Sequence, residues 1–141
     1  MATASQTFDL TFGAATKLAI KTSAAGFVNR ANFTTQPEIY IQDASGNVVT
    51  NSTASVLVEI DSGTITGTAT VAASSGVATF VGIGKTGLVG NKTLTFRSTG
   101  LTSVTQGFAL VNGAATQLAI TGSVNASLYY PTGPTLNVTK S

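Results

Sequence analysis

The sequence contains five carboxylate side chains, which are its first candidates for metal binding or acid–base chemistry. Glu59 and Asp61 lie two residues apart on an expected strand, so both face the same side and could approach Asp43 across a sheet. A Ca²⁺ ion needs roughly six to eight oxygen ligands gathered in a loop, and the sequence has no loop of alternating aspartates. We therefore expect a polar outer face, with Asp61 starting a turn, rather than a calcium site.

Two other patterns suggest catalysis or phosphate binding at first sight. Glu38 and Glu59 are candidates for glycosidic cleavage, which needs two carboxyl groups about 5–10 Å apart in a cleft lined by aromatic residues. The chain has no Trp and three Tyr, so such a cleft is not expected. Residues 82–87 read Gly-Ile-Gly-Lys-Thr-Gly, but they lack the phosphate-loop spacing and no helix is expected after them. We predict a loop here and no catalytic residues in the chain.

Composition excludes several classes of protein. The absence of Cys and His excludes disulfide scaffolds, thiol nucleophiles, histidine metal sites and Ser-His-Asp triads. Only 9% of the residues are charged, whereas 25 Thr, 13 Ser and 15 Gly make up more than a third of the chain. The seven cations are spread along the sequence and give a net charge of +2, so no nucleic-acid partner is expected. No cofactor is expected either.

Hydropathy raises the question of a membrane, because the mean hydropathy is +0.32. Residues 62–84 and 98–139 are uncharged, but Gly, Thr, Ser, Asn or Pro interrupts both stretches every few residues. Neither stretch supplies the roughly 20 apolar residues of a spanning helix, so no membrane partner is expected. Residues 1–12 contain no basic residue and no continuous apolar run, so we do not expect them to be a secretory signal.

Alternation of apolar and polar residues predicts short β-strands throughout. The expected strands cover residues 6–12, 16–22, 37–42, 56–60, 64–72, 77–83, 92–98 and 105–111. Turn residues separate them, most clearly Asp-Ala-Ser-Gly-Asn at 43–47. This pattern predicts an all-β fold, an antiparallel β-sandwich, with Phe80, Phe96 and Phe108 as its main core aromatics.

An internal repeat is the strongest signal in the chain. Residues 5–20 read SQTFDLTFGAATKLAI and residues 105–120 read TQGFALVNGAATQLAI, with ten of sixteen positions identical at an offset of 100. Residues 35–42 similarly parallel residues 132–139. The repeat divides the chain into three parts: a copy of a module's last strand at 1–12, one complete module at 13–112, and a partial second repeat of two strands at 113–141.

The order of motifs carries a resemblance to a known family. The motifs GAATKLAI, TTQPEIYIQDASGNVVT, GVATFVGI and LTFRSTGLTSVTQGFAL follow one another, and the resemblance covers residues 13–120. This order resembles the bacterial immunoglobulin-like repeats of invasin-type surface adhesins, which are also found in structural proteins of tailed bacteriophages. The resemblance implies an immunoglobulin-like sandwich that serves as a spacer, an adhesive surface or a decoration, and it brings no catalytic residues to carry over.

The two flanking parts cannot bury their apolar faces alone. They can pair with each other, fold onto the edge of the central module, or cross to a neighbouring subunit as an added strand. Tyr129 and Tyr130 suggest an interface because tyrosine is enriched there, although a loop covering one end of the sandwich would also explain them. The candidate interface residues are Phe8, Leu10, Phe12, Tyr129, Tyr130, Leu136 and Val138.

These observations favour a non-enzymatic structural protein of an assembled particle. We expect a virion component such as a bacteriophage head decoration, head fibre or tail-associated subunit, because an uncharged surface suits a subunit covered by its neighbours. Its partners would be other copies of itself or a major capsid or tail protein. The alternative is a module of a bacterial cell-surface adhesin that binds carbohydrate or a host protein.

Overall fold

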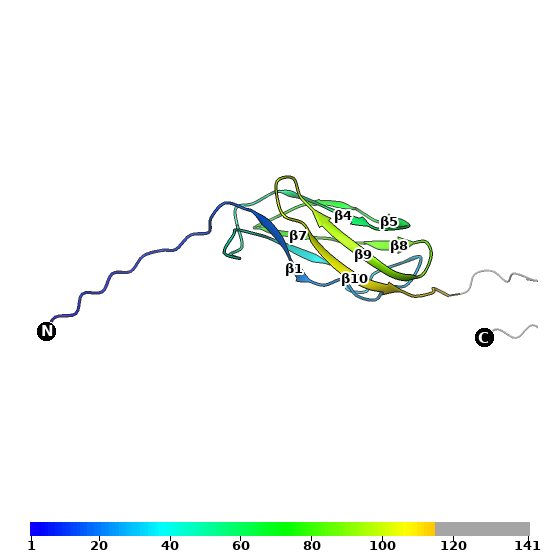
Figure 1. The fold of residues 1–141 in the computed structure, drawn as a ribbon, viewed down its shortest axis with the longest axis horizontal. Helices are drawn as coiled ribbons and strands as arrows, with labels where there is room; N and C mark the ends of the chain where they lie inside the picture. The colour runs from blue at the N-terminus through cyan, green and yellow to red at the C-terminus, as the bar shows by residue number, and fades with distance from the viewer. Residues whose placement is uncertain (115–141) are drawn as a thin grey trace, which may run out of the picture.

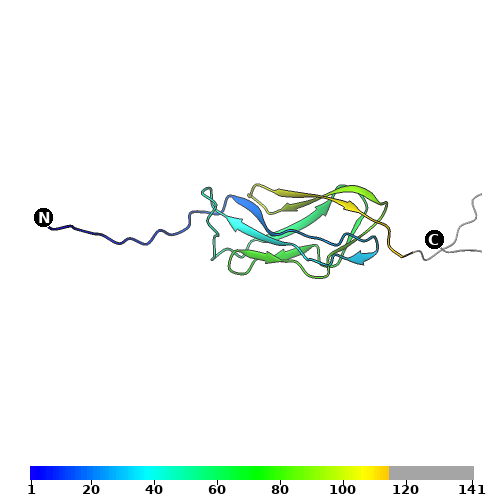
Figure 2. The same ribbon diagram turned by 90° about the horizontal axis from the view of Figure 1, so that it is seen from below.

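Alternating apolar residues build two β-sheets that face each other across a common core (Figures 1 and 2). The fold is taken from a computed structural model, which describes residues 1–114. The strands are β1 (Lys17–Thr22), β2 (Ala31–Asn32), β3 (Glu38–Gln42), β4 (Ser55–Ile60), β5 (Thr64–Thr66), β6 (Thr70–Ala72), β7 (Val77–Thr79), β8 (Gly84–Thr86), β9 (Gly90–Arg97) and β10 (Val104–Leu110).

The strand order confirms the predicted immunoglobulin-like β-sandwich. One sheet has the order β10-β9-β4-β6 and the facing sheet has the order β1-β3-β7. Every pairing between these strands is antiparallel. Among residues 1–114 there is no helix of the length and apolarity needed to cross a membrane.

Side chains from both sheets fill the core at alternate positions. Val56 and Val58 of β4 and Ile39 and Ile41 of β3 are all buried, as expected for strands with one face toward the core. Phe80 and Phe96 meet between the sheets with ring centroids 5.6 Å apart. The prediction that Phe80, Phe96 and Phe108 are core residues is confirmed.

A second aromatic group lies beside β10. Phe27 stacks on Phe108 with ring centroids 4.2 Å apart, and Phe33 packs edge-on against Phe27 at 4.9 Å. The sequence pattern missed Phe27 and Phe33 because both lie outside the regular strands, where no alternation marks them as buried.

The predicted continuous strand over residues 64–72 is wrong. The structure forms two strands, β5 and β6, which belong to different sheets. Gly67 separates them with a φ of 87°, and a Cβ at this position would lie 2.2 Å from the carbonyl oxygen of Gly82. Glycine therefore allows both the left-handed backbone and the close approach that let the chain change sheets.

The predicted loop over residues 82–87 is also wrong. Residues 84–86 form β8, which lies between β2 and β5 in a small third sheet. A Cβ on Gly84 would lie 2.4 Å from the carbonyl oxygen of Ala31, so this glycine serves close strand packing rather than a turn. The strand predicted over residues 77–83 accordingly ends early, at Thr79.

Residues 6–12 do not form the strand that their alternation predicts. A strand needs a hydrogen-bonding partner on at least one side, and the corresponding place in this module is already filled by β10. The segment instead runs outward from the sandwich (Figure 1).

Replacing Gly67 by alanine tests the sheet change between β5 and β6. Gly67→Ala should lower the free energy of unfolding by about 2 kcal/mol or more, because the left-handed φ and the backbone contact both oppose a Cβ. Gly100→Ala is the matched control, with a φ of 76° and nothing within 4 Å of an added Cβ. Urea unfolding of the two variants measures the difference, and equal losses would contradict the proposed role of the contact with Gly82.

Candidate interaction site

The two ends of the central module lie at opposite ends of the sandwich. The segment before β1 leaves at one end and the segment after β10 leaves at the other (Figures 1 and 2). Gly13 is tied to the first end by a hydrogen bond from its backbone N–H to Oδ2 of Asp43 at 2.8 Å. Asn29 and Val111 pair at the second end, where the Asn29 N–H donates to the Val111 carbonyl at 2.9 Å.

The candidate interface residues of the N-terminal segment differ in exposure. Phe8 is 79% exposed and Leu10 is 85% exposed, whereas Phe12 is half-buried against the core of the central module. Phe12 thus belongs to the module at its Gly13 end, whereas Phe8 and Leu10 are, with Met1, the exposed large apolar side chains of this segment. The other predicted interface residues, Tyr129, Tyr130, Leu136 and Val138, lie outside the described residues.

Strand β10, which residues 1–12 resemble in sequence, is held in the module by its inward face. Phe108 and Leu110 are 9% and 2% exposed. Gln106 accepts a hydrogen bond from the Ala24 N–H at 3.0 Å and donates one to the Ala24 carbonyl at 2.8 Å. This amide therefore joins the edge of the sheet to the crossover at residues 23–25. Sequence reasoning did not single out Gln106, although its identity with Gln6 in the repeat was a usable signal.

Asp43 has a structural role at the other end of the module. Besides the Gly13 N–H, its carboxylate accepts hydrogen bonds from the backbone and side chain of Asn47 at 2.9 and 3.0 Å. These donors, the Gly13 N–H first, lower the pKa of Asp43 from 3.8 to about 2. The predicted turn at residues 43–47 is confirmed.

The remaining predicted acidic residues do not converge on a site. Glu38 lies on β3, and Glu59 lies on β4 of the facing sheet, so they do not form the carboxylate pair of a glycosidase. Glu38 accepts hydrogen bonds from Thr22 and Lys21, which lower its pKa. Glu59 pairs with Arg97. Residues 1–114 contain no group of three acidic side chains placed to hold a metal ion.

Asp61 accepts a hydrogen bond from the Thr93 N–H at 3.1 Å, which ties the end of β4 to β9. The expectation that it starts a turn agrees with the bends that follow at residues 61–63.

Lys85 is an unexpected feature of the small third sheet. Its side chain is fully buried, and its Nζ donates to the carbonyl oxygen of Thr86 at 3.4 Å. Burial lowers the pKa of Lys85, and the nearby charge of Lys92 lowers it further. The sequence suggested a loop lysine here because the flanking glycines were interpreted as turn residues.

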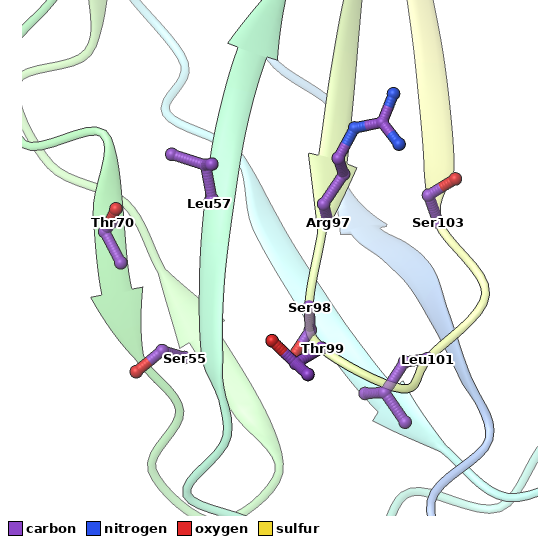
Figure 3. Close-up of a pocket in the computed structure, with 8 residues that line it drawn as sticks. All are labelled: Ser55, Leu57, Thr70, Arg97, Ser98, Thr99, Leu101 and Ser103. Carbon is purple, nitrogen blue, oxygen red and sulfur yellow. The ribbon is translucent and has the colours of Figure 1, made fainter.

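An open groove of about 500 Å³ lies on the outer face of the four-stranded sheet (Figure 3). Leu57 of β4, Arg97 of β9 and Leu101 of the β9–β10 loop line it. Five hydroxyl groups complete its lining, those of Ser55, Thr70, Ser98, Thr99 and Ser103. The groove offers hydrogen-bonding groups and small apolar patches, a composition that suits a polar ligand.

Comparison with known proteins supports the fold. No family model and no curated protein matches the chain. Eighteen solved chains match it, among them a β-glucuronidase from Parabacteroides merdae (18% identity, TM-score 0.52) and a β-glycosidase from Bacteroides vulgatus (14% identity, TM-score 0.54). The matches cover 70% of this chain but only 13% and 14% of those enzymes, so this chain resembles one small part of each.

The Asp43 carboxylate should make stability depend on acid. Because its pKa is about 2 in the folded protein and near 3.9 in an unfolded chain, its contribution is complete above about pH 4 and is lost as pH falls toward 2. Asp43→Asn should therefore lower the Tm at pH 7 and flatten the loss of Tm between pH 5 and pH 2. Glu59→Gln, in an exposed ion pair, is the control and should keep the wild-type acid slope. Identical slopes for wild type and Asp43→Asn would contradict this role.

The buried Lys85 should act in the opposite pH range. Since its pKa is lower in the folded protein than in the unfolded chain, the unfolded state binds more protons, and stability should rise as pH increases toward 10. Lys85→Met should raise the Tm at pH 7 and remove this alkaline rise. Lys17→Met, at a more exposed position, should do neither. Thermal unfolding followed by circular dichroism between pH 7 and 10 measures the slope of Tm against pH. A slope in Lys85→Met equal to that of the wild type would contradict this role.

Proposed function

We propose that the chain is a non-enzymatic structural protein of an assembled particle, most simply a virion component that makes contacts through strands and loops. The observation that carries this proposal is the exposure of Phe8 and Leu10. These residues belong to a segment that repeats the sequence of a core-facing strand, yet in the isolated chain they contact no core.

Burial of these two side chains favours association with a partner. Moving one large apolar side chain from water into a packed interior contributes about 1.5–3 kcal/mol. The exposed segment therefore carries a driving force that a neighbouring subunit can use, and extended segments commonly bind by adding a strand to a partner.

The opposite end of the module also presents apolar side chains. Leu88 and Val89 lie in the loop between β8 and β9, and Val111 follows β10. They are 85%, 42% and 52% exposed. Gly90 pairs with Leu110, so this loop lies beside the point where the chain leaves the module. Apolar groups at both ends support contacts along a row of subunits.

The acidic residues support a non-enzymatic role. Asp43, Glu38, Glu59 and Asp61 each accept a hydrogen bond that joins two parts of the sandwich. A glycosidase needs two carboxylates in one cleft, whereas Glu38 and Glu59 lie on different sheets. The glycosidases of similar fold match this chain over a small part of their length, which agrees with a module outside their catalytic machinery.

The groove beside Arg97 supports a second candidate, an adhesin module that binds carbohydrate. Its five hydroxyls and its guanidinium offer the hydrogen bonds that a sugar requires. A glycan array discriminates between the two proposals, because an adhesin should bind a defined glycan and lose it in Arg97→Ala. Binding that survives Arg97→Ala, or no binding at all, would contradict the carbohydrate function.

Substitution of the exposed apolar pair tests the particle function. The double variant Phe8→Ser with Leu10→Ser should keep the wild-type Tm, since neither side chain packs in the module, but should lose incorporation into particles. Density-gradient particles from the producing cells, probed with an antibody to the chain, provide the measurement. Thr7→Ser with Asp9→Asn is the control and should incorporate normally.

Two results would contradict the particle function. One is normal incorporation of the Phe8→Ser, Leu10→Ser variant. The other is recovery of the wild-type chain in the bacterial envelope with none in the particle band.

A further inference from the structure

The N-terminal segment repeats β10 at the positions that face the core. In β10, residues 104, 106, 108 and 110 face inward and residues 105, 107 and 109 face outward. Three of the four inward positions carry the same residue in both segments: Gln6 and Gln106, Phe8 and Phe108, Leu10 and Leu110. None of the three outward positions is identical. The repetition therefore preserves the face that contacts a sandwich interior and leaves the solvent face free to vary.

Each repeated side chain has a defined contact in the module. Gln106 forms two hydrogen bonds with Ala24, Phe108 stacks on Phe27, and Leu110 is buried in the core. The same three contacts are available to Gln6, Phe8 and Leu10 in any module with the same interior. Their own module cannot supply them, because β10 occupies that place.

The glycine that follows each of the two repeated segments gives independent evidence that the N-terminal segment fits the β10 place of another module. A Cβ on Gly113 would lie 2.6 Å from the carbonyl oxygen of Asn29, so this position requires glycine when the chain leaves β10. Gly13 is its counterpart in the repeat, but within its own chain a Cβ would meet only Asp43, at an ordinary 3.6 Å. The contacts of Gly13 in its own module therefore do not require glycine. A passage beside Asn29 of another module does require it.

We infer that residues 4–10 form the last strand of the sandwich in a second copy of this chain, in the place that β10 holds. In this arrangement Gly13 passes Asn29 of the second copy, and the next module begins beyond that end. Because the junction Gly-Ala-Ala-Thr is the same after both strands, the subunits would form a head-to-tail row with the geometry of a tandem repeat. The choice of a second copy of this chain as the partner rests on the proposed function.

The exchange is physically accessible because β10 is an edge strand. Along its length it pairs with β9 alone. Its other side is joined to the opposite layer by backbone hydrogen bonds only at its two ends, those of Thr102 with residues 16 and 18 and those of Val111 with residues 27 and 29. Thr7 replaces Gly107, which favours the strand, whereas Ala4, Ser5 and Asp9 replace Val104, Thr105 and Ala109, which weakens it. Exchange therefore depends on the concentration of subunits. At low concentration the covalently attached β10 holds its place, and crowding of subunits in a particle favours exchange.

A disulfide in a defined register tests the inference, since the chain has no cysteine of its own. Thr105 of β10 faces Thr95 of β9, so Ser5 of one copy should face Thr95 of the other. Full-length Ser5→Cys and an affinity-tagged Thr95→Cys chain are mixed at high concentration and mildly oxidised. We expect a cross-linked heterodimer, with a disulfide between positions 5 and 95 identified by mass spectrometry of its peptides. Asp9→Cys is the register control, because its counterpart Ala109 faces Asn91 instead.

Gly13→Ala provides the second arm. Introduced into the Ser5→Cys chain, it should reduce the yield of this cross-link several-fold without changing the Tm of the monomer, whereas Gly113→Ala should lower that Tm. The inference is overturned if no disulfide forms between positions 5 and 95, if Asp9→Cys reacts equally well, or if Gly13→Ala leaves the yield unchanged. If the cross-link fails while Phe8→Ser with Leu10→Ser still abolishes incorporation, the particle function stands and the partner is a different protein.

Discussion

The packing of the last strand against the opposite layer is the constraint on which the rest of this structure depends. Strand β10 lies at an edge, yet its inward side chains complete the core and its Gln106 joins the sheet to residues 23–25 through paired hydrogen bonds. A sandwich without this strand would expose Phe27 and leave the Ala24 backbone groups without their partner. Such losses are costly because buried polar groups need hydrogen bonds and aromatic side chains need close packing.

This constraint explains why a second copy of the strand matters. A segment with the same inward residues is suited to one kind of surface, the open side of a sandwich with the same interior. The segment at residues 1–12 leaves its own module at the end opposite to the exit from β10 (Figure 1). Its exposed phenylalanine and leucine therefore favour contact with another module. This arrangement supports the proposed structural function more directly than the groove supports carbohydrate binding, because the lining residues of the groove are also those of a polar sheet surface.

The fold was largely predictable from sequence, and the exceptions have specific causes. Alternation located the long strands and the three core phenylalanines because burial on one face imposes a period of two. It failed at Gly67 and at residues 84–86. The glycines there allow two backbone segments to approach closely, and in the sequence such a glycine looks the same as a turn glycine. It also failed for residues 6–12, because alternation marks one apolar face of a segment, whereas a strand also needs a neighbouring strand to form hydrogen bonds with. For the candidate site, the repeat identified Phe8 and Leu10. The roles of Gln106 and Gly113 depend on contacts with residues about 80 positions away, which no local pattern encodes.

Hydrogen exchange of the N-terminal segment tests the central claim most directly. The amides of residues 4–10 should exchange at the rate of an unstructured peptide in dilute monomer, because no strand pairs with them there. In concentrated or particle-bound protein they should become protected to the level that the β10 amides show in dilute monomer, and the β10 amides should lose that protection in the same sample. Continued fast exchange of residues 4–10 in the assembled state would contradict the claim that this segment is a last strand supplied to a neighbour.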